Sequence, residues 1–295
     1  MSTLVLLLAL QTRPPLLEAS LIARDGCAQP TQAAAALEGV RKQAPSEAAL
    51  IDRAHAAIAR GRCKEVLDAA AALLTRWGDQ NPGDSRVQHQ AVALLASLAD
   101  RGEEHHVAGR PYLEMATKRA RALAAKWPRD AEAQAHLGAM LGIVSAGSLE
   151  ALQVFGKCLE LDPQHKLCRQ SFHELAEYYE APRCDRETLR KVTLVVAQKT
   201  IVDGKSGLSG AVLLVARDGK PHVHLYLDDV ARSHVVDAGA TAQTLNVVVD
   251  GKTIEQIAIA GAAMKELVEL GSGQIEIVCR NVTRRALPEN LKKYR

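Results

Sequence analysis

The sequence predicts an α+β protein of two domains: an N-terminal α-helical hairpin repeat over 46–182, followed by a small antiparallel-sheet α+β domain over 190–283. Two observations predict this division. Up to residue 180 the apolar residues recur with the period of a helix, whereas beyond Pro182 short β-branched runs are separated by Asp-Gly pairs. The length of 295 residues is also more than a single typical domain needs.

Residues 1–45 are expected to form an N-terminal segment that holds a residual signal sequence and then a linker or helix. Leu4–Leu10 is an apolar run, at the lower limit of the roughly 7–15 residues of a signal peptide. It is too short for the roughly 20 residues of a membrane-spanning helix, so no transmembrane span is expected. No basic residue precedes the run. A periplasmic or cell-envelope location is favoured, with the cytoplasm as the alternative.

The helical half consists of segments in which apolar residues recur at i, i+3 or i+4, and i+7. Glycine and proline separate these segments, because both residues terminate helices. The breaks are expected at Gly61, 81–83, Gly102, Pro128, Gly147 and Pro163. Successive helices joined by such short breaks are typical of antiparallel hairpins.

A repeat of 35 residues relates two of the hairpins. Ala116, Ala120 and Pro128 recur as Ala151, Phe155 and Pro163.

Within the better of the two repeats, we expect Gly138 and Ala151 to allow close helix approach and Phe155 to fill the space between hairpins. We also expect Asp162 to cap the next helix and Pro163 to occupy its first position.

The pattern of Ala135-His136-Leu137-Gly138, Ala151, Phe155 and Leu161-Asp162-Pro163 resembles the tetratricopeptide repeat (TPR), and the resemblance extends over roughly 46–180. It implies a TPR-like α-solenoid with an open groove that binds a protein or peptide partner. By position in the motif, the groove residues would be Glu132, Ala135, Ala139, Gly142 and Ile143. The resemblance therefore implies a non-enzymatic scaffold or adaptor, and the alternative is that the hairpins only support the second domain.

Strands are predicted throughout the C-terminal half, and they are rich in β-branched residues. They are expected at 192–197, 211–216, 222–228, 245–249, 254–259 and 275–279. In 222–228 the apolar residues alternate with His222, His224, Tyr226 and Asp228, which indicates one buried and one polar face. Asp-Gly pairs at 203–204, 218–219 and 250–251 are expected to form hairpin turns. Amphipathic helices are expected at 264–270 and at 229–238.

The segment 192–282 also resembles, more weakly, the periplasmic head domain of the SecD protein-export subunit. The matching parts are Gly219-Lys220-Pro221 with the strand that follows, Val247–Gly251, and Gly273-Gln274-Ile275. This resemblance implies a protein of the cell envelope that handles polypeptides.

A metal-dependent or hydrolytic enzyme is the alternative function, with its site on the C-terminal domain. His222, His224 and Asp228 are the candidate ligands, together with His234, because histidines two apart on a strand share one face. An exposed alternating strand produces the same pattern, so no metal and no cofactor are expected. None of the GxSxG, HExxH, Walker or dinucleotide-binding motifs occurs, and we expect a protein that is not an enzyme.

The charge balance of +3, with both signs interspersed, lacks the basic stripe of nucleic-acid binding proteins. We therefore expect no nucleic-acid partner; the oligomeric state stays open. The basic segment 284–295 is read as a solvated tail, with a docking surface as the alternative.

Six cysteines permit three disulfides in 15 pairings, or free thiols. No CxxC pair occurs, so zinc ribbons and dithiol redox motifs are not supported.

Overall fold

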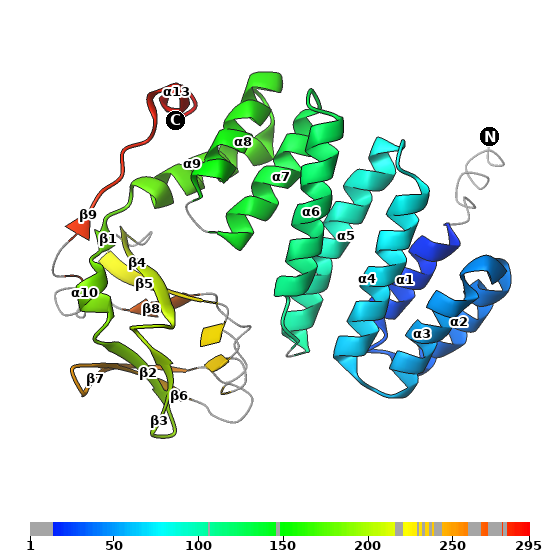
Figure 1. The fold of residues 1–295 in the computed structure, drawn as a ribbon, viewed down its shortest axis with the longest axis horizontal. Helices are drawn as coiled ribbons and strands as arrows, with labels where there is room; N and C mark the ends of the chain where they lie inside the picture. The colour runs from blue at the N-terminus through cyan, green and yellow to red at the C-terminus, as the bar shows by residue number, and fades with distance from the viewer. Residues whose placement is uncertain are drawn as a thin grey trace, which may run out of the picture. The chain divides into compact units, whose positions relative to one another are not determined.

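The protein is α+β, with a series of helices followed by two antiparallel sheets (Figure 1). The computed structural model describes residues 14–295, except for 106, 146–147, 216–220, 229, 232–233, 236–237, 239–243, 259–266, 271–278 and 280–281. The chain divides into two compact units, Met1–Pro128 and Arg129–Arg295. The helical series thus contributes to both units, and the change from helices to strands near residue 182 falls inside the second.

The helices of the first unit are α1 (Pro15–Asp25), α2 (Pro30–Gln43), α3 (Ala48–Ala59), α4 (Cys63–Gln80), α5 (Ser85–Glu104) and α6 (Arg110–Lys126). The helices of the second unit are α7 (Ala131–Val144), α8 (Leu149–Leu161), α9 (Lys166–Glu180), the short α10 (Arg186–Leu189) and α13 (Glu289–Lys292). The strands are β1 (Arg183–Cys184), β2 (Val192–Val196), β3 (Lys199–Asp203), β4 (Leu208–Val215), β5 (Pro221–Leu227), β6 (Thr244–Val249), β7 (Lys252–Ala258), β8 (Leu267–Leu270) and β9 (Val282–Thr283).

Consecutive helices of the first unit pack against each other, and α4 also packs against α1. Small residues dominate these contacts: Ala54, Ala70 and Ala91 are completely buried, which permits close approach of the helix backbones. The buried hydroxyl of Tyr112 on α6 donates to Asp68 Oδ1 on α4 over 3.0 Å. Burial, and then the charge of Asp68, raise the pKa of Tyr112, so this hydroxyl keeps its proton.

The segment before residue 46, expected to hold a linker or helix, contains the two packed helices α1 and α2, whose buried side chains include Leu17 and Leu37. One expectation for the first unit is wrong. Gly102 does not break a helix, because α5 continues to Glu104. A Cβ at Gly102 would lie 2.7 Å from the carbonyl oxygen of Val107, so the glycine accommodates the chain that returns after the helix. The apolar run at 4–10 lies outside the described residues.

The first helices of the second unit confirm the predicted close approach. A Cβ at Gly138 of α7 would lie 2.8 Å from the ring of Phe155, and Ala151 is completely buried. The predicted cap of α9 is wrong, because Asp162 accepts from the backbone N–H of Gln164 within the turn. His165 is the N-cap of α9, so Pro163 precedes the helix and does not occupy its first position.

The C-terminal segment is not a solvated tail. After the exposed residues 284–286, Leu287 and Leu291 are buried in a core cluster with Phe155 and Phe172 of α8 and α9. The ring of Tyr294 packs edge-on against Phe172, with centroids 5.6 Å apart. The segment containing α13 therefore covers apolar surface that α8 and α9 would otherwise expose.

The strands form a five-stranded sheet of order β8-β5-β4-β1-β9 and a four-stranded sheet of order β3-β2-β6-β7, with antiparallel pairing throughout. One core cluster draws on both sheets. Val223 and Leu225 of β5 contribute from the first sheet, and Leu194 and Val247 contribute from the second. The predicted alternation of β5 is confirmed, because Val223, Leu225 and Leu227 are all buried.

The turns agree only in part with the predicted Asp-Gly hairpins. Asp250 and Gly251, with φ of 48° and 78°, connect β6 to β7 as predicted. Asp203-Gly204 does not form a hairpin, because β3 and β4 belong to different sheets. The β2–β3 hairpin instead turns at Ala197 and Gln198, which adopt φ of 47° and 68°; such left-handed conformations are uncommon for residues other than glycine or asparagine. The pair 218–219 lies outside the described residues, although β4 and β5 do pair as neighbours.

The predicted helix at 264–270 is also wrong, because Leu267–Leu270 is strand β8, paired with β5. A short apolar run satisfies both periods, and here the open edge of β5 determines the outcome. Val230, Ala231, His234, Val235 and Ala238 are helical, as expected for 229–238, and the residues between them are outside the described part. The predicted strand residues 275–278 also lie outside the described part.

All six cysteines form disulfides. The pairs are Cys27–Cys63, Cys158–Cys168 and Cys184–Cys279, with Cα atoms 5.4, 6.3 and 4.7 Å apart. The first pair joins the residues after α1 to the start of α4, the second joins α8 to α9, and the third ties β1 to the chain before β9. The helices of the first unit, the α8–α9 pair and the strand-containing part of the second unit thus have one disulfide each.

Candidate functional site

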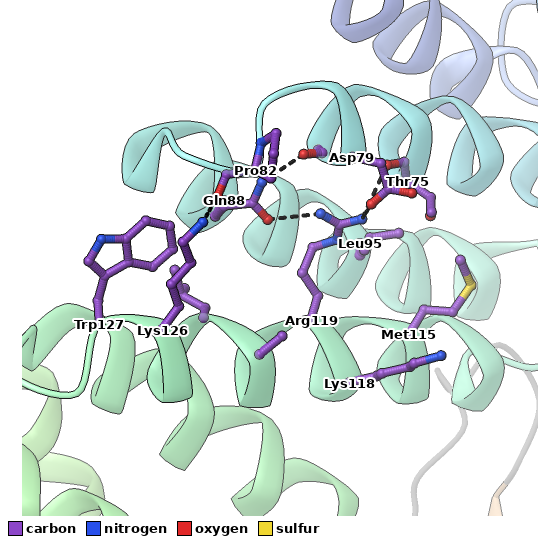
Figure 2. A pocket seen from close by; sticks show the side chains of 13 residues that line it. Thr75, Asp79, Pro82, Gln88, Leu95, Met115, Lys118, Arg119, Lys126 and Trp127 are labelled. Atoms are coloured by element: carbon purple, nitrogen blue, oxygen red, sulfur yellow. Dashed lines mark hydrogen bonds and ion pairs between the residues drawn. The ribbon is translucent and has the colours of Figure 1, made fainter.

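A pocket of about 540 Å³ lies in the first unit (Figure 2), within the range of roughly 300–1,000 Å³ of ligand sites. It is bordered by the end of α4, by α5 and by α6. The lining residues are Thr75, Gly78, Asp79, Pro82, Gln88, Leu95, Met115, Lys118, Arg119, Ala122, Leu123, Lys126 and Trp127.

Arg119 organises this pocket. Its guanidinium extends from α6 toward α4 and α5, where it donates to Gln88 Oε1 at 2.8 Å, the Thr75 carbonyl at 3.1 Å and Asp79 Oδ1 at 2.6 Å (Figure 2). A Cβ at Gly78 would lie 2.1 Å from Arg119 Nη1. Only a glycine at this point of α4 allows the guanidinium to lie across the helix.

Gln88 completes the same network from α5. Its amide nitrogen donates to the carbonyl oxygens of Gly78, at 2.7 Å, and Asn81, at 3.0 Å. Its amide oxygen is then directed to Arg119. Because Gln88 is only 8% exposed, these bonds satisfy buried polar groups, and they fix both side chains in one arrangement.

The rim of the pocket is cationic and its wall is apolar. Lys126 donates to the carbonyl oxygen of Pro82 and lies 4.9 Å from the ring centroid of Trp127. Lys118 is exposed and has no carboxylate partner among the residues that the structure describes. Of the charged lining residues, Lys118, Arg119 and Lys126 are positive and Asp79 is negative, which leaves a formal charge of 3 − 1 = +2. Such a surface fits an apolar group that carries a negative charge nearby.

The five groove residues predicted on α7 do not form one accessible surface. Ala135 is completely buried and Ala139 is packed against the same core cluster. A Cβ at Gly142 would lie 3.3 Å from Leu175 of α9. Only Ile143, 44% exposed, and Glu132 have side chains open to solvent.

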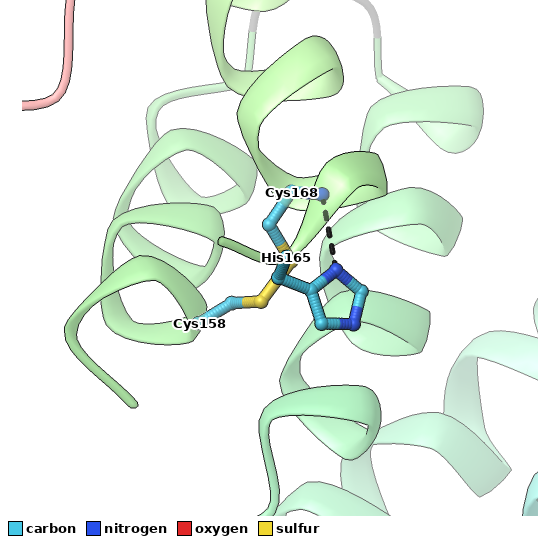
Figure 3. A group of neighbouring side chains, drawn as sticks. All are labelled: Cys158, His165 and Cys168. Atoms are coloured by element: carbon cyan, nitrogen blue, oxygen red, sulfur yellow. Dashed lines mark hydrogen bonds between the residues drawn. A yellow bond between two sulfur atoms is a disulfide. The ribbon is translucent and has the colours of Figure 1, made fainter. Parts of the chain in front are cut away.

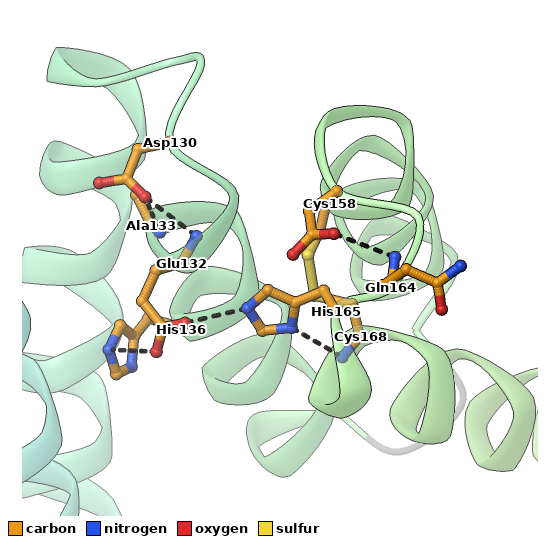
Figure 4. Close-up of a disulfide and its surroundings, with 9 residues drawn as sticks. Asp130, Glu132, Ala133, His136, Cys158, Gln164, His165 and Cys168 are labelled. Atoms are coloured by element: carbon orange, nitrogen blue, oxygen red, sulfur yellow. Dashed lines mark hydrogen bonds and ion pairs between the residues drawn. A yellow bond between two sulfur atoms is a disulfide. The ribbon is translucent and has the colours of Figure 1, made fainter.

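Glu132 takes part in a polar contact between α7 and the start of α9 (Figure 4). Its carboxylate lies 2.9 Å from His165 Nε2 and 3.6 Å from His136 Nε2. The backbone N–H of Cys168 donates to His165 Nδ1, so Nδ1 carries no proton and Nε2–H donates to Glu132. The contact thus positions His165, the N-cap residue of α9, and it joins only α7 and α9.

One group of side chains has the spacing of a metal site. It consists of Cys158, His165 and Cys168, whose ligand atoms lie within 4.8 Å of one another (Figure 3). The two sulfur atoms form a disulfide, and metal coordination requires thiolates. The oxidised protein therefore offers no metal site here.

The structure brings together only two of the four residues that were considered as metal ligands. His222 and His224 lie side by side on β5, with ring centroids 4.6 Å apart. Asp228 Oδ1 accepts from the backbone N–H of Ala231, and His234 Nδ1 lies 3.0 Å from the carbonyl oxygen of Ile201. Asp228 is thus engaged in a local turn and His234 in a contact with β3, so the predicted constellation does not form among the described residues.

His224 of β5 instead contacts an aromatic residue of α9, in a group that also contains Tyr226 and Arg183. The hydroxyl of Tyr178 on α9 is 2.6 Å from His224 Nδ1, and the ring of Tyr178 is edge-on to Tyr226. Burial, and then the hydroxyl of Tyr178, raise the pKa of Tyr226. Burial, and then the charge of Arg285, lower the pKa of Arg183. These groups form a polar contact between α9 and the five-stranded sheet.

Sequence reasoning missed the α4–α6 pocket because its residues are brought together from three helices. The available signal was Gly78, a glycine inside an otherwise apolar helical pattern, where it is less favourable than alanine by about 1 kcal/mol. Such a glycine indicates a close approach by another group.

Among the described residues, none of the helices is both long and apolar enough to span a bilayer. Comparison with known protein families, with curated proteins and with solved structures finds no match to this chain.

Proposed function

We propose that this chain is a non-enzymatic binding protein whose α4–α6 pocket holds a segment of a partner protein. The segment would carry a carboxylate next to a large apolar side chain. The observation that supports this proposal is the combination of an apolar wall, formed by Leu95, Met115 and Trp127, with the formal charge of +2 in the lining. The resemblance of the helices to tetratricopeptide repeats supports the same class of function, through a different surface.

The preformed network supports a binding role further. Arg119 and Gln88 are held by bonds to neighbouring helices, so little side-chain freedom would be lost when a partner binds. Lys118 has no such restraint in the described part of the chain, and its ammonium group is available to a carboxylate at the rim. The partner's apolar side chain would enter beside Met115 and Leu123.

Synthetic peptides in which glutamate adjoins phenylalanine or leucine would test this function. We expect the fluorescence of Trp127 to change on titration, and replacement of glutamate by glutamine to weaken binding. Lys118→Glu should weaken binding of the glutamate peptides at least fivefold, because it reverses a rim charge. Arg53→Glu, an exposed cation of α3 outside the pocket, is the matched control. Equal binding of the glutamate and glutamine peptides would reject the proposal.

We further propose that the protein functions in an oxidising compartment such as the periplasm or cell envelope. Three disulfides that include every cysteine support this location, because reducing compartments keep thiols free. The weaker resemblance to the SecD head domain agrees with it. A thiol count on denatured protein from its native compartment would test the location; six reactive thiols would contradict it.

A further inference from the structure

A second pocket lies in the other unit, where the C-terminal segment packs against α8 and α9. Its volume is about 520 Å³. The lining residues are Leu159, Pro163, Arg169, His173, Lys293, Tyr294 and Arg295. The side chains of this lining comprise three permanent cations, a histidine and three uncharged groups, and none of these side chains is a carboxylate.

The C-terminal segment is held firmly enough to form one wall. Tyr294 donates to Glu160 Oε1 over 2.6 Å, and Lys293 Nζ is 3.1 Å from the same oxygen. A Cβ at Gly156 of α8 would lie 3.1 Å from both Leu291 and Tyr294. The close approach at Gly156 therefore allows the segment to settle on the helix.

The cations of this pocket are only partly neutralised. Glu160 offsets Lys293, and Glu180 offsets Arg295. Arg169 donates to the Pro163 carbonyl at 2.6 Å and to Gln164 Oε1 at 3.2 Å, which are neutral acceptors. Among the side chains, three permanent cations against two carboxylates leave 3 − 2 = +1.

We propose that this pocket binds a phosphate monoester of a small molecule with an aromatic or apolar body. Arg169 presents a planar fork of donors that matches a phosphate, and Lys293 adds a point charge. The ring of Tyr294, with Leu159 and Pro163, supplies an apolar wall for the organic part. The volume exceeds what a phosphate group alone would fill. This site is independent of the α4–α6 pocket and of the function proposed for it.

Phenyl phosphate is a suitable probe, and isothermal titration calorimetry of the full-length protein is a suitable measurement. We expect saturable binding with one site per chain. Arg169→Gln and Lys293→Gln should each weaken the affinity at least tenfold. Lys199→Gln, which removes an exposed cation of β3 far from this pocket in the sequence, should leave it unchanged. Circular dichroism would confirm that each variant is folded.

Two further probes test the class of ligand. Inorganic phosphate should bind more weakly than phenyl phosphate, because it lacks the group that contacts Tyr294. Benzoate, with a single negative charge, should also bind more weakly. The proposal is overturned if phenyl phosphate does not bind at about 10 mM, if benzoate binds equally well, or if Arg169→Gln and Lys199→Gln have the same affinity as the unmodified protein.

Discussion

The hydroxyl of Tyr178 lies 2.6 Å from Nδ1 of His224 and thereby connects α9 to the middle of β5. The contact is partly buried and joins residues 46 positions apart in the sequence. Helical and sheet portions of the second unit are coupled through this pair of side chains.

Tyr178→Phe should lower the free energy of unfolding by about 1 kcal/mol, the net contribution of a typical intramolecular hydrogen bond. Urea unfolding followed by circular dichroism measures this quantity. Tyr179→Phe is the matched control, because the ring of Tyr179 faces Arg285 and this contact survives the change. Equal effects of the two substitutions would show that the bond to His224 is not specifically stabilising.

The three disulfides should stabilise the protein unequally. Cys184–Cys279, Cys27–Cys63 and Cys158–Cys168 are separated by 95, 36 and 10 residues. The entropy of loop closure in the unfolded chain then gives about 4.7, 3.8 and 2.7 kcal/mol respectively. Double Cys→Ala variants of each pair, compared by thermal unfolding, should lose stability in that order. A larger loss for the Cys158–Cys168 pair than for the Cys184–Cys279 pair would contradict the order.

Gly78→Ala should have opposite effects in two backgrounds. In the unmodified protein the new methyl group displaces the Arg119 guanidinium and breaks its bonds, so the substitution should destabilise. In an Arg119→Ala background the same substitution should stabilise α4 by about 1 kcal/mol through helix propensity. Denaturation of the four proteins of this double-mutant cycle measures the coupling energy. Additive effects would mean that Arg119 does not depend on the glycine.

Leu291→Ala should lower the free energy of unfolding by about 2–5 kcal/mol, the range for leucine truncation in a core. Leu291 is 3% exposed and packs in the cluster of α8 and α9. The control is Leu167→Ala on α9, because Leu167 is 44% exposed and its truncation should change stability by less than about 0.5 kcal/mol. Limited proteolysis would also cut the C-terminal segment faster in the Leu291 variant.

The helical series and β5 were predictable because their signals are local. Glycine and proline occur at most breaks between helices, and the alternation of Val223 and Leu225 with His222 and His224 identifies the buried face of β5 without knowledge of its neighbours. The predicted helix break at Gly102 and the predicted helix at 264–270 were wrong for the same reason. In both cases the surrounding chain, and not the local pattern, determines the conformation.

The sites depend on contacts between residues that are distant in the sequence, so they were less predictable. The approach of Arg119 to Gly78 depends on how α4 and α6 pack. Ala135 was assigned to a groove by its place in the predicted repeat, yet it is buried in a core cluster that includes residues of α8, α9 and α13. The cysteine pairing could not be chosen from 15 possibilities before the strands and helices were positioned.

Both tryptophans of the chain, Trp77 and Trp127, belong to the first compact unit, and the second unit contains tyrosines but no tryptophan. Selective excitation of indole fluorescence therefore reports on one unit only, whereas tyrosine emission comes largely from the other. An unfolding curve recorded with each chromophore would reveal whether the two units melt together or in separate steps, without any added label.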